Sequence, residues 1–144
     1  MIGFNHAATG GLLAKYLPLP IAIPVAFASH FILDALPHYG IPNHSRDKSW
    51  FWRAFYIVDF VAAWTLGFVS WLVWHHPEYF LVGFIACSPD FLWVARVITS
   101  HSFDLSKNQN KFTKWHARIQ KLERPWGIYL EIPLAVVLFL LVRP

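Results

Sequence analysis

Apolar residues fill four long runs of the chain, and short polar segments separate them. The runs cover residues 17–36, 54–74, 79–98 and 126–142. Each is near the length of about twenty residues that an α-helix needs to cross a hydrocarbon core of about 30 Å. The first run is the weakest, because three prolines interrupt its start (Pro18, Pro20 and Pro24). The pattern predicts an all-α membrane protein, with a bundle of about four membrane helices in a single integral membrane domain, 1–144.

Two shorter segments add to this bundle. Residues 2–16 predict an apolar helix that is too short to span, and the proline-rich turn at 17–20 would reverse the chain into a re-entrant hairpin or an interfacial helix. Between the third and fourth runs, residues 111–124 place apolar side chains at helical spacing: Phe112, Trp115, Ile119 and Leu122. We therefore expect an amphipathic helix here, with its basic face in water.

Composition agrees with a membrane protein. Hydrophobic residues make up 56% of the chain and charged residues only 14%. The single cysteine, Cys87, excludes an intramolecular disulfide and a CxxC zinc motif. The stretch Ala26-Phe27-Ala28 resembles a signal-peptide cleavage site, but Lys15 comes too late to form the basic region of a signal peptide. We therefore expect this segment to stay in the protein.

The chain has a net charge of +4, and most of its basic residues lie in two loops. Six of the twelve basic residues lie in 107–124, after the third run, and Arg46, Lys48 and Arg53 follow the first. Both loops lie on one side of a four-helix topology, so the positive-inside rule predicts an inner (cytoplasmic) membrane protein with its basic loops in the cytoplasm. Such loops orient the helices and contact anionic lipids, and we expect no nucleic-acid binding.

One stretch of the first run carries side chains that can bind a metal ion. His30, Asp34 and His38 are spaced four residues apart, which brings them to nearly one face of a helix, each about 6 Å further along its axis. Burying imidazole and carboxylate in an apolar segment costs several kcal/mol unless each finds a partner. Pro37 should end the helix, so His30 and Asp34 form the firm pair and His38 a flexible third.

Each of the four apolar runs contains one carboxylate. They are Asp34, Asp59, Asp90 and Glu131. In the expected topology all four lie in the cytoplasmic half of the bundle or near its middle, with His6 and His116 at a similar level, whereas His75 and His76 fall on the opposite side. This placement predicts one polar cavity that opens to the cytoplasm.

Simpler roles remain open for several of these residues. Asp59 can instead cap a neighbouring helix or pair with Arg96, and Asp90 can be satisfied by the backbone groups that Pro89 frees. His6 can be an ordinary residue near a terminus, and His116 an ordinary interfacial histidine.

Histidines and carboxylates without thiols suit a divalent metal, zinc best, or manganese or iron if carboxylates predominate. We assign His6, His30, Asp34, His38 and Asp90 as metal ligands, and Asp59, Glu131 and His116 as catalytic groups. The expected chemistry is attack of an activated water on an ester or phosphoester, with a carboxylate as general base. The expected partners are membrane lipids and an amphipathic phosphoester substrate such as a phospholipid or prenyl phosphate, with a homo-oligomer possible.

Several motifs resemble those of the small membrane-bound metal-dependent hydrolases, a family similar at motif level to zinc phospholipase C. The motifs are His6 before a small-residue helix, Ser29-His30-x3-Asp34-x2-Pro37-x2-Gly40-x-Pro42, and Pro89-Asp90. They cover about a third of the chain, and the resemblance implies a metal site and hydrolase activity. Two elements depart from the family: its Pro-Asp-x-Asp-His element is reduced to residues 89–93, and its His-x4-His element is represented at most by Ser100-His101-Ser102.

Two other functions fit parts of the pattern. A haem or electron-transfer protein would use His30 with His6 or His116 as axial ligands, although Asp34 favours a harder cation. An ion or proton transporter would use the carboxylates inside the membrane as a relay, and helices broken at Pro24 and Pro89 fit that role.

Overall fold

A computed structural model describes residues 1–40, 50–100 and 110–144, with side chains described in 1–40, 50, 54–92 and 110–144. The chain is mostly helical, as predicted. The helices are α1 (Gly3–Tyr16), α2 (Leu19–Asp34), α4 (Trp50–Leu72), α5 (Pro77–Ser100), α6 (Lys111–Ile119) and α7 (Ile128–Val142), with a 3-10 turn at Pro125–Gly127 before α7. The predictions about Pro42, His101 and the side chain of Arg96 fall outside the described residues.

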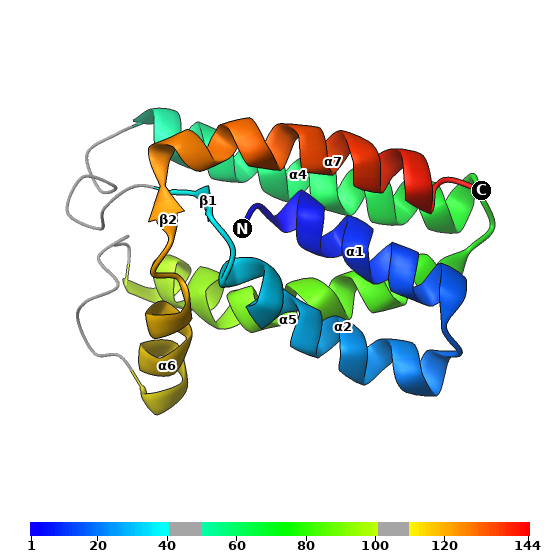
Figure 1. Ribbon diagram of the computed structural model, residues 1–144, viewed down its shortest axis with the longest axis horizontal. Helices are drawn as coiled ribbons and strands as arrows, with labels where there is room; N and C mark the ends of the chain where they lie inside the picture. The colour runs from blue at the N-terminus through cyan, green and yellow to red at the C-terminus, as the bar shows by residue number, and fades with distance from the viewer. Residues whose placement is uncertain (41–49, 101–109) are drawn as a thin grey trace.

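The centre of the bundle is α1, which packs against α2, α4, α5 and α7 (Figure 1). Small residues allow these close contacts. A Cβ atom added at Gly10 would lie 2.5 Å from the carbonyl oxygen of Val82 and 2.6 Å from the Cα atom of Gly83 on α5. The helix that the sequence presents as a short accessory segment is therefore the one around which the others are arranged, because only small side chains let helix backbones approach this closely.

A tight turn at 17–18 joins α1 to α2, which runs back antiparallel to it. The turn lies where the prolines predict it, since Pro18 precedes α2 and Pro20 occupies its first turn, where no intrahelical N–H bond is lost. The hairpin places the start of α1 beside the end of α2. His6 and His30 thereby become neighbours, with ring centroids 4.1 Å apart.

A two-stranded parallel sheet, which the sequence did not predict, links the end of the first hairpin to the segment after α6. Strand β1 (His38–Tyr39) pairs with β2 (Glu123–Arg124), His38 opposite Glu123. Helix α6 therefore ends at Ile119, earlier than the amphipathic pattern predicts, because the following residues leave it to form the turn and strand. A Cβ atom at Gly127 would lie 2.1 Å from the His38 carbonyl carbon, so the 3-10 turn before α7 packs directly on β1.

Hydrophobic side chains cover the outside of the bundle, and polar ones lie inside it. Buried polar residues include Asn5, His6, His30, Asp34 and Glu131, whereas large aliphatic side chains of α4 and α7 are exposed. Two helical segments, Ala54–Leu72 and Pro125–Val142, are long and apolar enough to cross a membrane, and α2 is a shorter apolar helix. Two of the four predicted runs therefore form helices that meet this test of length and composition.

Close packing of α1 on α5 gives a first prediction. Gly10→Leu should lower the free energy of unfolding by about 1–3 kcal/mol, because any side chain here meets backbone atoms that cannot move aside. Thermal unfolding in detergent micelles, followed by circular dichroism, measures the change. Ala28→Leu adds the same side chain at an exposed position of α2 and should leave the midpoint unchanged. Equal midpoints for Gly10→Leu and the wild type would contradict the close approach.

Candidate metal centre

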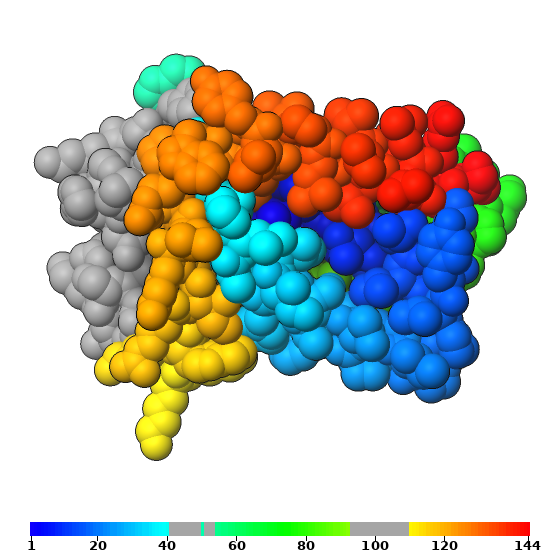
Figure 2. Space-filling view, in the orientation of Figure 1, coloured from blue at the N-terminus to red at the C-terminus, as the bar shows by residue number. Residues whose placement is uncertain are grey.

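Four side chains from three helices meet at one end of the bundle. His30 and Asp34 come from the last turns of α2, Asp90 from α5 and His116 from α6. One ligand atom from each lies within 4.8 Å of all the others, and all but Asp90 are buried. Figure 2 shows α6 and β2 (yellow to orange) packed beside the residues around β1 (cyan) at this end. The group can hold a metal ion.

The separations between ligand atoms match a compact coordination shell. Asp34 Oδ2 lies 2.8 Å from His116 Nε2 and 3.2 Å from His30 Nε2, and the two histidine Nε2 atoms are 3.2 Å apart. Ligands bound at about 2.0–2.1 Å in a tetrahedron lie about 3.3 Å from one another. His30 Nε2 and Asp90 Oδ1 are 3.6 Å apart, slightly more than this edge. The positions therefore suit a small divalent cation.

The orientation of His30 is set by the backbone of α5. Its Nδ1–H donates to the carbonyl oxygen of Ala86 at 2.8 Å, since a carbonyl can only accept. The proton on Nδ1 leaves the Nε2 lone pair directed toward Asp34 and His116. Histidines that bind metals are held in this way, by a hydrogen bond from the second ring nitrogen.

Asp34 is surrounded by nitrogen atoms on both of its carboxylate oxygens. Gln120 Nε2 donates to Oδ2 at 3.0 Å, beside the histidines of the group. The other oxygen, Oδ1, lies 3.2 Å from His6 Nε2 and also contacts the amino group of Met1. His6 therefore touches the group through Asp34 but is not one of its four members, and its Nδ1 has no hydrogen-bond partner among the described residues.

His38 lies apart from the four-residue group, although it was predicted as a metal ligand. The helix ends before it, and the residue belongs to β1, where its Nδ1–H donates to the carbonyl oxygen of Leu36 at 2.8 Å. His116, which the sequence placed among the catalytic groups, is instead a member of the four-residue group. Gln120 was not predicted, but its position four residues after His116 on the amphipathic segment is a signal that could have found it.

Asp59 and Glu131 bind the start of α1. Asp59 accepts hydrogen bonds from the backbone N–H groups of Gly3 at 2.7 Å and Phe4 at 3.0 Å, and Glu131 accepts from Ile2 N–H at 3.0 Å. These donors have no partner within the helix, so the carboxylates cap its buried N-terminus. The contacts of Asp59 match the capping role that the sequence left open for it. The catalytic role of the two carboxylates stays a prediction.

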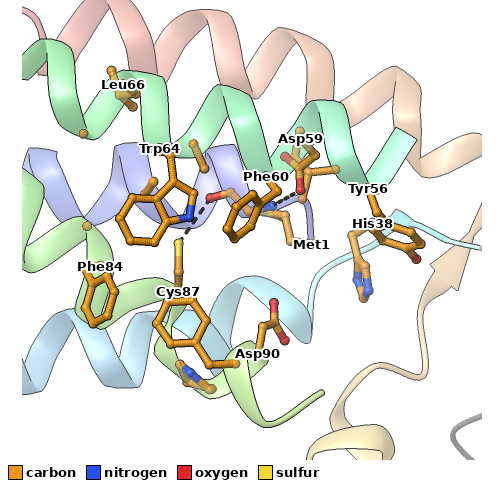
Figure 3. A pocket seen from close by; sticks show the side chains of 18 of the residues that line it. Met1, His38, Tyr56, Asp59, Phe60, Trp64, Leu66, Phe84, Cys87 and Asp90 are labelled. Carbon is orange, nitrogen blue, oxygen red and sulfur yellow. Dashed lines mark hydrogen bonds between the residues drawn. The ribbon is translucent and has the colours of Figure 1, made fainter. Parts of the chain in front are cut away.

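A cavity of about 580 Å³ begins at the metal centre and extends between α4 and α5. Asp90 and His116 line it as well as belonging to the metal group. Figure 3 shows Asp59 and Asp90 toward one end of the cavity and the rings of Trp64 and Phe84 toward the other. The cavity thus joins a polar, metal-competent end to an apolar interior.

Tyr39 also lines the polar end of this cavity. Burial, with the nearby Glu131 carboxylate, raises the pKa of the Tyr39 phenol. The side chain is therefore neutral at neutral pH and adds no negative charge near Asp59 and Asp90.

Comparison with models of known protein families, with curated proteins and with solved structures finds no match to this chain. The resemblance to the membrane-bound metal-dependent hydrolases stays a prediction from the motifs.

The contacts of Asp59 give a second prediction. Asp59→Ala should lower the free energy of unfolding by about 1–3 kcal/mol, because it leaves half-buried N–H groups of α1 without an acceptor. Its metal content should equal that of the wild type, since the side chain is outside the four-residue group. Thermal unfolding and elemental analysis on the same preparation measure both. A stably folded variant that has lost its metal would show that Asp59 is a ligand rather than a cap.

Proposed function

We propose that this protein is a zinc-dependent hydrolase of the cytoplasmic membrane that cleaves a lipid or prenyl phosphoester. The observation that carries the proposal is the convergence of His30, Asp34, Asp90 and His116 within 4.8 Å at the mouth of an apolar cavity. A water-soluble substrate would have no use for such a cavity, whereas an amphipathic one needs both parts.

The four residues divide into three ligands and one general base. His30, Asp34 and His116 are buried and lie within 3.2 Å of one another through their ligand atoms, and three protein ligands are typical of catalytic zinc. A bound zinc ion would supply a Lewis acid that makes water nucleophilic at neutral pH and stabilises charge on the phosphoryl group. Asp90 is one-third exposed and faces the cavity, so its carboxylate is placed to accept the proton of the attacking water.

The remaining contacts keep this arrangement fixed. Ala86 holds the ring of His30, and Gln120 holds the Asp34 oxygen that faces the two histidines. His6 stacks on His30 and contacts the other oxygen of Asp34, so it positions both. Catalysis by prepositioned groups depends on such supports, since displacements of about 1 Å can cost about 100-fold in rate.

The membrane location is supported by the two long apolar helices and by the exposed aliphatic side chains around a polar interior. The basic residues of α6 lie at the end of the bundle that holds the metal centre. The positive-inside rule then assigns this end to the cytoplasm, and the same charges attract an anionic phosphoester to the site.

The contacts fit a haem site and an ion relay less well. The rings of His6 and His30 are stacked with centroids 4.1 Å apart, and the Nε2 atoms of His30 and His116 are 3.2 Å apart. Axial ligands bound at about 2 Å on opposite sides of an iron atom would be about 4 Å apart with a macrocycle between them. Asp59 and Glu131, which a relay would need, bind backbone amides of α1.

The ligand assignment gives a third prediction. Protein purified without chelators should contain about one zinc ion per chain, and His30→Ala or Asp34→Asn should lower this content about tenfold or more, because each removes a ligand or its charge. Elemental analysis after desalting measures the content. His75→Ala, an exposed histidine in the turn between α4 and α5, is the matched control and should retain full zinc. Metal-free wild-type protein would refute the proposal.

The role of Asp90 gives a fourth prediction. Asp90→Asn should lower kcat for a phosphoester substrate by about 100-fold to 10,000-fold, which is the usual contribution of a general base, while zinc content stays at the wild-type level. Release of phosphate or of the phosphorylated headgroup from phospholipid and prenyl phosphate vesicles measures the rate. Loss of zinc in Asp90→Asn would instead make Asp90 a fourth ligand, and zinc-loaded wild-type protein that cleaves none of these substrates would contradict the proposed reaction.

A further inference from the structure

The cavity beside the metal centre is lined mainly by apolar side chains. Its walls come from α4 and α5, and they include the aromatic residues Phe60, Trp64, Phe80 and Phe84. Its floor is the face of α1 that carries Gly3, Ala7 and Gly11, at helical spacing of four. Because these residues have little or no side chain, α1 cannot fill the space between its two neighbours, and a slot remains.

The slot has a defined direction and length. Asp90 and Tyr79, which both line it, are eleven positions apart on α5, and a helix rises about 16 Å over that distance. This is about half of a hydrocarbon core. At the Tyr79 end of the slot, a Cβ atom on Gly11 would already lie 2.8 Å from Val142 Cγ2. Helices α1 and α7 therefore pack closely there and leave no room for the slot to continue. The cavity therefore extends inward from the metal centre and then stops.

From this shape we infer that the slot between α4 and α5 binds one hydrocarbon chain of the substrate, with the phosphoester group of the same molecule at the metal centre. The inference rests on the proposed function and adds to it the way in which the lipid is bound. The slot has a volume of about 580 Å³, which is in the range of small-molecule sites. Its walls are mainly apolar, as the binding of an acyl or isoprenoid chain requires.

Continuity with the metal centre distinguishes this occupant from lipid of the surrounding bilayer. Asp90 and His116 belong to the metal group and also line the slot, together with Gln120, which binds Asp34. A molecule whose chain fills the slot from its polar end must therefore place its headgroup beside these side chains. Bulk lipid has no such requirement, since its headgroup would stay at the membrane surface.

The test uses the whole zinc-loaded protein in phosphatidylcholine nanodiscs and an alkyl phosphate that carries a photoreactive diazirine in the middle of its chain. Crosslinks should map to the lining residues of α4 and α5, such as Phe60, Trp64 and Phe84. Excess dodecyl phosphate should lower this labelling about tenfold or more, because its chain competes for the same buried position, and ethyl phosphate should not.

A substitution in the slot supplies the second arm. Ala63→Phe, on the lining face of α4, should lower the labelling about tenfold, whereas Val61→Phe, which adds an aromatic ring on the exposed face of the same helix, should leave it unchanged. Zinc content and melting temperature verify that the variants fold, and Ala63→Leu replaces Ala63→Phe if the larger ring prevents folding. Labelling that dodecyl phosphate does not lower, or that neither Ala63 variant lowers, would assign the slot to bulk lipid and overturn the inference.

The same measurements separate this inference from the proposed reaction. Labelling with the expected competition but no cleavage of any phosphoester would retain the chain-binding slot and reject the hydrolase. Cleavage of long-chain and short-chain substrates at ratios that Ala63→Phe leaves unchanged would retain the hydrolase and reject the slot.

Discussion

Burial of the N-terminus of α1 is the constraint on which the rest of the structure depends. A helix that starts inside a bundle has backbone N–H groups with little access to water, and each needs an acceptor. Asp59 from α4 and Glu131 from α7 supply these acceptors to Ile2, Gly3 and Phe4. These hydrogen bonds offset the cost of placing the two carboxylates inside the bundle. They also join two helices that are distant in sequence to the start of α1.

With α1 fixed at the centre, the metal centre and the cavity both follow from its sequence. The hairpin to α2 brings His30 and Asp34 level with His6, and the contact of Gly10 with Gly83 sets the position of α5 and hence the depth of Asp90. Other small residues of the same helix, Gly3, Ala7 and Gly11, leave the slot between α4 and α5 unfilled. The polar metal centre and the apolar slot therefore both depend on the small residues of α1.

Local patterns predicted the helices, a turn within 17–20 and the pairing of His30 with Asp34, because these depend on residues close in sequence. Which distant residues complete the group was harder to predict. Pro37 releases His38 from the helix, but only the pairing of β1 with β2 decides where it lies, and strands of two residues leave no periodic signal. That pairing also shortens α6. Counting one carboxylate per apolar run indicated acids inside the bundle, of which Asp34 and Glu131 are buried and Asp59 and Asp90 are half-buried. The count could not separate the members of the four-residue group from the caps of α1.

The surroundings of Asp34 favour a cation at this position. Its carboxylate is completely buried, and three histidines, Gln120 and the amino group of Met1 surround it. The amino group supplies a countercharge at Oδ1, whereas Oδ2 faces His30, His116 and Gln120, and neutral side chains offer hydrogen bonds but no full positive charge. Protonated histidines would repel one another, since the Nε2 atoms of His30 and His116 are 3.2 Å apart. A divalent ion between those nitrogens and Oδ2 would accept the histidine lone pairs and add positive charge on that side of the carboxylate.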